Sequence, residues 1–186
     1  MRGESRRAAV FLDRDGVINR ARVVDGRPFP PRSLADLEIL PGVADACAEL
    51  RDAGFLLIVV TNQPDVARGS LAPALLDAMH TELRRHVNLD DIRSCRHDDA
   101  HDCACRKPKP GMLVAAAHDY EIDLTQSFMV GDRWRDIEAG RRAGCKTVLV
   151  DHGWAERPAD RPDAVVRHLR SAAWWILSVS GQRESA

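Results

Sequence analysis

The sequence lacks any apolar run that approaches the length of a membrane span. A transmembrane helix needs roughly 20 consecutive apolar residues, whereas the apolar run Ala172–Leu177 is far shorter. The apolar run after the N-terminal arginines ends at Asp13, which is too early for a signal peptide. We therefore expect no membrane partner and a cytoplasmic location.

The sequence also lacks an excess of charge of either sign. It has 27 Lys and Arg residues against 28 Asp and Glu residues, so its formal net charge at pH 7 is −1. Proteins that bind nucleic acid or anionic lipid electrostatically present a basic face. We therefore expect no nucleic-acid partner, and a zinc-dependent nucleic-acid binder is an unfavoured alternative.

The length leaves little room for a second domain. A chain of 186 residues with 45% hydrophobic content is most simply one globular domain with a sizeable core. We predict a domain over residues 8–179, without a large cap domain, between tails at residues 1–7 and 180–186. We expect this domain to be a monomer.

Strand-like and helix-like segments alternate along the chain. The predicted strands are Ala8–Leu12, Phe55–Val60, Ile92–Cys95, Ser127–Val130 and Lys146–Val150. Between them, apolar residues recur at helical spacing. This alternation predicts an α/β fold, with a Rossmann-like parallel sheet and helices on both of its faces.

Two carboxylates follow the first predicted strand. Asp13 and Asp15 stand two positions apart, and Gly16 after them allows a sharp turn. A charged turn without chemistry has the same pattern, because Asp and Gly are ordinary turn residues. The carboxyl end of a strand is nevertheless the usual ligand position in an open α/β fold, so we expect an active site here.

Other polar residues occupy similar positions. Thr61 follows the second predicted strand, Asp132 and Asp136 follow the fourth, and Lys107 lies in a proline-rich segment. Each has a structural explanation as well: a strand-terminal Thr, helix N-terminal charges and an exposed lysine. The long connection Arg20–Pro41 is of the length that commonly forms a binding loop, and we expect it to border the site.

The cysteines predict a metal site rather than disulfides. There are five, an odd number, and three of them cluster. Three thiolates and one imidazole form the closed tetrahedral set that a structural Zn²⁺ prefers. The predicted ligands are Cys95, His97, Cys103 and Cys105, with His101 as the alternative to His97.

The motifs together resemble those of the haloacid dehalogenase superfamily of phosphatases. They are, in order, FLDRDGVIN, TNQ followed by ARG, the cysteine and histidine cluster running into CRKPKPG, and GDRWRDI. The resemblance covers about residues 8–178. The zinc cluster and the small size are similar to the subgroup that contains heptose-bisphosphate and histidinol-phosphate phosphatases.

The resemblance implies a role for each motif residue. Asp13 would attack phosphorus to form an aspartyl-phosphate, and Asp15 would be the general acid and base. Mg²⁺ would be bound by Asp13, the backbone carbonyl of Asp15, and Asp132, with Asp136 behind these direct ligands. The residues that would bind phosphate oxygens are Thr61, Asn62 and Lys107.

The expected substrate is a small phosphorylated sugar. Arg68 and Arg106 are positioned by the resemblance to meet a second phosphate, which favours a heptose 1,7-bisphosphate cleaved at its 7-position. The short segment between His97 and Cys103 is closer to the histidinol-phosphatase type, so histidinol phosphate remains an alternative. Further alternatives are a polynucleotide 3′-phosphatase and a non-enzymatic zinc-stabilised interaction domain, which need not keep both carboxylates.

Overall fold

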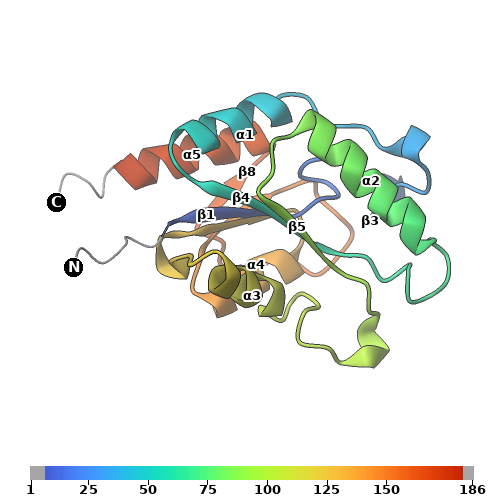
Figure 1. Cartoon of the computed structure of the whole chain (residues 1–186). Coiled ribbons are helices and arrows are strands. Elements are labelled where there is room, and N and C mark those ends of the chain that lie inside the picture. The colour runs from blue at the N-terminus through green and yellow to red at the C-terminus, as the bar shows by residue number, and fades with distance from the viewer. Residues whose placement is uncertain (1–6, 182–186) are drawn as a thin grey trace.

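The computed structural model describes residues 7–181, and a six-stranded parallel sheet forms the centre of this part of the chain (Figure 1). In spatial order the strands are β5 (Asp91–Cys95), β4 (Leu56–Asn62), β1 (Ala9–Leu12), β6 (Phe128–Gly131), β7 (Lys146–Val150) and β8 (Ala164–Val166). The five predicted strands are all present, with small shifts at their ends. Every residue of β1 is buried because both faces of the sheet are covered.

The order of the strands places a topological switch point at β1. The chain runs from β1 through β4 to β5 on one side, and then returns to add β6, β7 and β8 on the other side. Residues 13 and 132 follow the neighbouring strands β1 and β6. Ligands of open α/β sheets bind at such a point, outside the carboxyl ends of the strands.

Helices cover both faces of the sheet, as the sequence predicts (Figure 1). One face packs against α1 (Val43–Asp52), α2 (Pro73–His86) and α5 (Leu169–Gly181), and the other against α3 (Gly111–Asp119) and α4 (Trp134–Ala143). Alternate residues of each strand enter the two cores, because successive strand side chains point to opposite faces. Phe11, for example, lies in the α3–α4 core, and Leu12 lies in the α1–α5 core.

The long connection after β1 is more ordered than the predicted loop. It contains an antiparallel hairpin of β2 (Arg22–Val24) and β3 (Arg27–Phe29), followed by a short 3₁₀ helix, η1 (Leu34–Asp36). Two further 3₁₀ turns are η2 (Asp99–His101) and η3 (Leu124–Gln126). The strands of the hairpin are too short for periodicity to reveal them. No large cap domain is present within residues 7–181.

The predicted division into a domain over residues 8–179 and two tails stays a prediction. Arg7 forms an isolated bridge with Ile122, and α5 continues to Gly181. Residues 1–6 and 182–186, which make up most of the two predicted tails, lie outside the described residues. Among the helices of residues 7–181, none has the length and apolarity that crossing a membrane requires.

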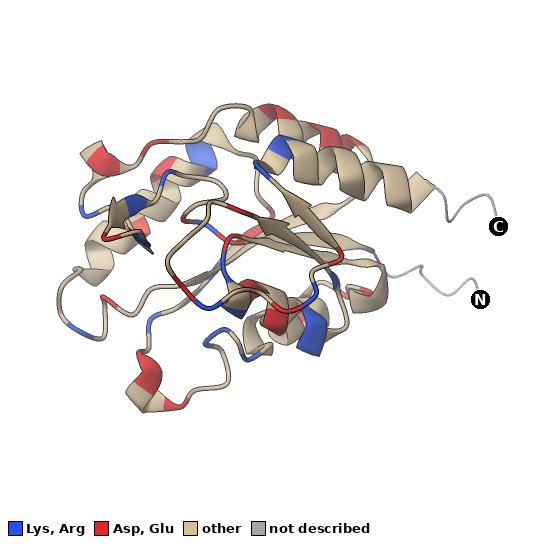
Figure 2. Cartoon of the chain, turned by 180° about the vertical axis from the view of Figure 1, so that it is seen from behind, with Lys and Arg blue, Asp and Glu red and all other residues tan. Residues whose placement is uncertain are grey.

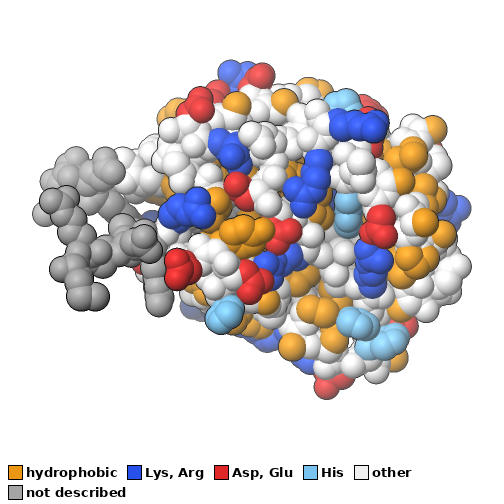
Figure 3. All heavy atoms as spheres, in the orientation of Figure 1, with side chains coloured by type: hydrophobic (Ala, Val, Ile, Leu, Met, Phe, Trp, Pro, Cys, Tyr) orange, Lys and Arg blue, Asp and Glu red, His pale blue; other side chains and the backbone are white. Residues whose placement is uncertain are grey.

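Charged residues of both signs are distributed over the molecule. Basic and acidic segments alternate along the ribbon in Figure 2. On the face seen in Figure 3, basic, acidic and apolar side chains are interspersed rather than gathered into one basic field. This distribution matches the small net charge and offers little electrostatic attraction for a polyanion.

Candidate active site

Polar residues from three neighbouring strands meet at the carboxyl edge of the sheet. They border a pocket of about 290 Å³ that also receives residues 27–30 of the hairpin, so the connection after β1 borders the site as expected. Eight of the predicted site residues line this pocket: Asp13, Asp15, Thr61, Asn62, Arg68, Arg106, Lys107 and Asp136. Asp132 lies behind them and is buried.

Lys107 is buried between two carboxylates. The alternative explanation from the sequence, that Lys107 is an ordinary exposed lysine, is therefore wrong. Its Nζ lies 2.7 Å from Asp13 Oδ1 and 2.6 Å from Asp136 Oδ1, and it donates to the Val60 carbonyl at 2.7 Å. Burial alone would lower the pKa of Lys107, but Asp13 and Asp136 together raise it above its usual value. The ammonium group therefore stays charged beside Asp13.

Asn62 holds the backbone of Lys107 in place. Its side-chain amide donates to the Lys107 carbonyl at 2.9 Å and accepts from the Lys107 N–H at 3.0 Å. Both ends of the amide are thus engaged by one residue. The phosphate contact that we predicted for Asn62 stays a prediction, and the observed contacts give it a positioning role.

Three buried carboxylates converge beside Lys107. Each of Asp13, Asp132 and Asp136 offers an oxygen, and these oxygens lie within 4.8 Å of one another. Burial raises the pKa of Asp13 to about 6; Lys107 opposes this effect, while Asp136 and Asp15 add to it. Burial, followed by the charges of Asp13 and Asp136, raises the pKa of Asp132 well above its usual value. One lysine does not neutralise three carboxylates, so the site favours an additional cation.

Asp132 has one oxygen that is free for such a cation. Its Oδ2 accepts from Trp154 Nε1 at 2.7 Å, whereas its buried Oδ1 has no hydrogen-bond partner within residues 7–181. Gly16 permits this arrangement, because a Cβ there would lie 2.2 Å from Asp132 Oδ2. The φ of Gly16 is +89°, which also disfavours any side chain. An unpartnered carboxylate oxygen among other carboxylates fits the hard oxygen ligands of Mg²⁺.

Asp136 has both oxygens engaged by the protein. Oδ1 lies 2.6 Å from Lys107 Nζ, and Oδ2 accepts from the backbone N–H of Arg133 at 3.0 Å, closing a capping box at the start of α4. The expected role of Asp136 at the start of a helix is therefore observed, in addition to its contact with Lys107. The predicted place of Asp136, behind the direct metal ligands, agrees with these contacts and stays a prediction.

Asp15 is held by three side chains. Arg14 donates to both of its oxygens at 2.9 Å, Asn19 donates to Oδ1 at 2.9 Å, and Gln63 donates to Oδ2 at 2.9 Å. Arg14 has no exposed surface and sits between the two catalytic candidates in sequence. The sequence analysis missed it, although an arginine inside an Asp-x-Asp pair was a visible signal. Gln63 also donates to Thr61 Oγ1 at 2.9 Å, so Asp15 and Thr61 are positioned together.

Five arginines line the pocket. Four of them are paired with acidic residues, whereas Arg27 of the hairpin forms no ion pair within residues 7–181. Arg106 Nε and Arg135 Nη1 donate to the same Asp99 oxygen at 2.8 and 3.2 Å. The hydrogen bond from Arg106 lowers the pKa of Asp99 to about 2. Arg68 is more loosely paired, 3.5 Å from Asp65. Arg135 was not among the predicted site residues, because its position as the second residue of α4 gave no signal.

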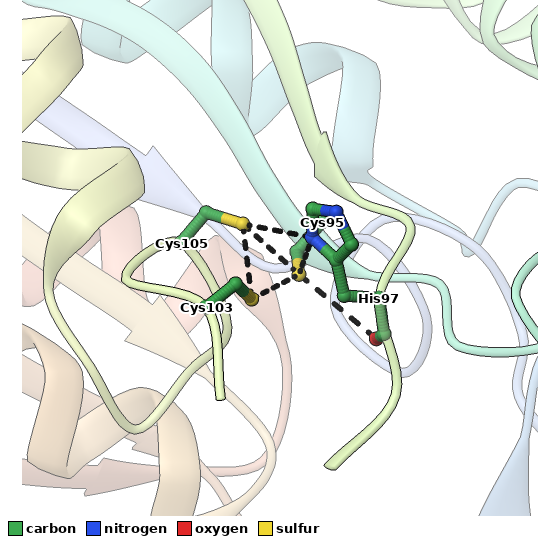
Figure 4. A group of neighbouring side chains, drawn as sticks. All are labelled: Cys95, His97, Cys103 and Cys105. Carbon is green, nitrogen blue, oxygen red and sulfur yellow. Dashed lines mark hydrogen bonds between the residues drawn. The ribbon is translucent and has the colours of Figure 1, made fainter. Parts of the chain in front are cut away.

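The predicted zinc ligands lie together on the segment that leads to Lys107 (Figure 4). Cys95 Sγ lies 3.5 Å from Cys103 Sγ and 3.2 Å from Cys105 Sγ, and His97 Nδ1 lies 3.4 Å from Cys105 Sγ. His101 is instead 2.6 Å from Asp98. The four ligand atoms fall within 4.8 Å of one another, as a single tetrahedral metal requires. This geometry favours His97 over His101.

The chain resembles proteins of known family over nearly its whole length. It is 37% identical to a D-glycero-D-manno-heptose-1,7-bisphosphate 7-phosphatase from Thermosynechococcus vestitus, covering 92% of this chain and 96% of that protein. The chain belongs to the haloacid dehalogenase-like hydrolases. The HAD-hydrolase-like family model matches residues 104–172, which include Lys107, Asp132 and Asp136.

Two further haloacid dehalogenase-like relatives support this assignment. A D-glycero-beta-D-manno-heptose-1,7-bisphosphate 7-phosphatase from Pseudomonas putida is 41% identical, over 82% of this chain and 87% of that one. The crystal structure of a D,D-heptose 1,7-bisphosphate phosphatase from B. bronchiseptica, complexed with magnesium and phosphate, superposes with a TM-score of 0.81. It is 34% identical and covers 92% of this chain and 99% of that one.

Proposed function

We propose that the protein is a Mg²⁺-dependent phosphatase that removes the 7-phosphate of D-glycero-D-manno-heptose 1,7-bisphosphate. The observation that carries this proposal is the buried pair of Asp13 and Lys107 at the switch point of the sheet. The names of the high-coverage relatives supply the substrate. The small Arg-lined pocket suits a small phosphorylated sugar better than a polymer.

Asp13 is the nucleophile of the proposed reaction. One of its carboxylate oxygens forms a bond to phosphorus as the bond from phosphorus to the sugar oxygen breaks, which gives an aspartyl-phosphate and an alkoxide. Lys107, 2.7 Å from Asp13 Oδ1, offsets the repulsion between the carboxylate and the phosphate. Thr61, buried at the end of β4, offers a hydroxyl to a phosphate oxygen.

Asp15 moves the protons. It gives a proton to the departing sugar oxygen and then takes one from the water that attacks phosphorus, so the second step releases inorganic phosphate and regenerates Asp13. Arg14, Asn19 and Gln63 fix the carboxylate for both transfers. Their contacts explain how a partly exposed acid keeps one orientation.

Asp13, Asp132 and the backbone carbonyl of Asp15 would hold the Mg²⁺. The unpartnered Asp132 Oδ1 and the excess of carboxylates support this assignment, and the magnesium in the B. bronchiseptica relative is consistent with it. When bound, the ion supplies positive charge that brings the anionic nucleophile and phosphate together. Cys95, His97, Cys103 and Cys105 would fill all four positions of a bound Zn²⁺, so we propose a structural role for that ion.

Mg²⁺ binding should weaken in acid. Because the pKa of Asp13 in the metal-free protein is about 6, roughly one molecule in ten has this carboxylate ionised at pH 5. We expect the apparent Mg²⁺ affinity at pH 5 to be about tenfold weaker than at pH 7.5, as measured by calorimetric titration.

The same pKa shift has a consequence for stability. A pKa raised above its ordinary value of 3.8 gives stability that is fully present below about pH 4 and is lost as pH rises through 6. Mg²⁺ should therefore raise the melting temperature of metal-free protein more at pH 7.5 than at pH 5. Asp132→Asn should abolish most of this increase, and an equal increase at both pH values would contradict the site.

Selectivity for a bisphosphate should depend on Arg106. A charge-assisted hydrogen bond is worth about 1.5–3 kcal/mol, so Arg106→Ala should lower kcat/KM for heptose 1,7-bisphosphate about tenfold or more. A monophosphate should lose much less, because it has no second phosphate to bind. Arg142→Ala, on α4 and outside the pocket, is the matched control that should leave both rates unchanged.

A panel of three substrates separates this proposal from its alternatives. We expect heptose 1,7-bisphosphate to have a much higher kcat/KM than histidinol phosphate, and a 3′-phosphorylated oligonucleotide to be a poor substrate. If histidinol phosphate proves better, or if the Arg106 variant loses both activities equally, the histidinol-phosphate assignment takes precedence. A monomeric, cytoplasmic enzyme remains our prediction.

A further inference from the structure

A second pocket, of about 390 Å³, lies on the other side of the catalytic loop. It is bounded by Gly16 and Val17, by the start of α1, by the end of β7 and by the start of α5. Its volume falls in the range of small-molecule sites, about 300–1,000 Å³. None of the proposed catalytic, zinc or phosphate-binding residues lines it.

The lining combines an apolar floor with a basic rim. The apolar residues are Val17, Leu40, Pro41, Val43, Val150 and Leu169. The rim consists of His152, Arg167, His168 and Arg170, and no acidic residue lines the pocket. An apolar floor beside two arginines is complementary to an organic anion with an apolar body.

The two rim arginines are available for a ligand. Within residues 7–181, Arg167 and Arg170 form no ion pair, whereas four of the five arginines that line the catalytic pocket are paired with Asp65, Asp99 or Glu156. The side chain of Arg170 lies against Gly42 at the start of α1: its Cδ would be 3.8 Å from a Cβ at that position. Arg170 is therefore held at the edge of the pocket.

The pocket is physically joined to the catalytic loop. His152, on its rim, donates from Nε2 to the Gly16 carbonyl at 2.7 Å, and Gly16 in turn lies directly against the Asp132 carboxylate. The His152 ring also packs against Trp154 in a tilted arrangement, with centroids 4.8 Å apart, and Trp154 donates to Asp132. A ligand that contacts His152 and Gly16 therefore touches groups that position a proposed metal ligand.

We propose that this pocket is a second ligand site, which binds a small organic anion and is coupled to Mg²⁺ binding at the catalytic pocket. The anionic head, a phosphate, sulfonate or carboxylate, contacts Arg167 and Arg170, and the apolar body covers Val17 and Val43. The coupling is reciprocal, because a ligand that changes the affinity for Mg²⁺ has its own affinity changed by the same factor.

The probe for this site is 8-anilinonaphthalene-1-sulfonate, which carries a sulfonate on an aromatic body. We expect the folded chain to bind one molecule, and the double variant Arg167→Ala/Arg170→Ala to bind it at least tenfold more weakly. The matched control is Arg141→Ala/Arg142→Ala, which removes two arginines from α4 on the opposite face of the sheet. This control should bind the probe like the unchanged protein.

Two measurements locate the probe. Amide chemical shifts should change at Gly42, Val43 and Leu169, and saturating inorganic phosphate in the absence of Mg²⁺ should leave the probe bound. Equal affinity of the Arg167/Arg170 variant, or displacement by phosphate, would overturn the site. If light scattering showed that the chain dimerises as probe binding disappears, a second copy would be the occupant and the proposal would fail.

The coupling has its own readout. With the probe saturating, the dissociation constant for Mg²⁺ should change by about threefold or more, and the Arg167→Ala/Arg170→Ala variant should show no such change. Both arginines are exposed and lie outside the catalytic pocket, so the variant should keep the basal phosphatase activity and melting temperature. If the probe left the Mg²⁺ affinity of the original protein unchanged, the proposed coupling would be refuted.

Discussion

Replacing Asp13 by Asn should lower phosphatase activity by about 10⁴-fold or more. The amide cannot supply the carboxylate oxygen that bonds to phosphorus, and a covalent route has no substitute for that group. The measurement is steady-state hydrolysis by Asp13→Asn protein whose mass spectrum excludes deamidation. Asp52→Asn, an exposed residue at the end of α1, is the matched control and should keep full activity.

The same variant should still fold. Because burial disfavours the ionised form of Asp13, as its raised pKa shows, a neutral side chain of the same shape relieves this cost in the metal-free protein. Lys107 keeps its contact with Asp136. We expect a melting temperature equal to or above that of the original protein without Mg²⁺. Appreciable turnover by pure Asp13→Asn protein would refute the covalent mechanism. Loss of the fold would contradict the conclusion that burial disfavours the ionised form of Asp13.

Removing a zinc ligand should have the largest effect on stability. We expect about one Zn²⁺ per chain by elemental analysis, and we expect His97→Ala to lose it. Structural zinc contributes folding free energy directly, and about 1 kcal/mol shifts the melting temperature of a chain this size by about 2–4 °C. A loss of several kcal/mol should therefore lower the melting temperature by about 10 °C or more.

The His97→Ala variant should also lose phosphatase activity. Cys105 immediately precedes Arg106 and Lys107, and a Cβ at Gly111 would lie 2.3 Å from the Ala104 carbonyl, so the segment is tightly packed. Loosening it would move Lys107 away from Asp13. His101→Ala is the matched control, because His101 contacts Asp98 rather than the cysteines, and it should keep its zinc. Retention of zinc by His97→Ala together with its loss from His101→Ala would reverse the choice of ligand.

The sequence alone was sufficient for the features that depend on local pattern. Apolar runs and helical spacing predicted the alternation of strands and helices, because the periodicity of a strand or a helix depends only on neighbouring residues. The positions of Asp13, Thr61 and Asp132 at the carboxyl ends of strands could be predicted from the apolar runs that precede them, since parallel strands present their carboxyl ends at one edge. The cysteine cluster could be found in the same way, because its members lie within eleven residues.

The tertiary structure decided what those residues touch. Lys107 and Asp13 are 94 positions apart, and only the packing of the zinc-bearing segment against β1 and β4 brings them within 2.7 Å. Trp154 reaches Asp132, and Gln63 reaches Asp15, through contacts that no local periodicity encodes. The rim of the second pocket likewise joins residues 152 and 167–170, which the sequence separates. The local pattern of apolar and polar residues determines which helices and strands form. The contacts among side chains depend on how these elements pack, because burial and charge pairing act between residues distant in sequence.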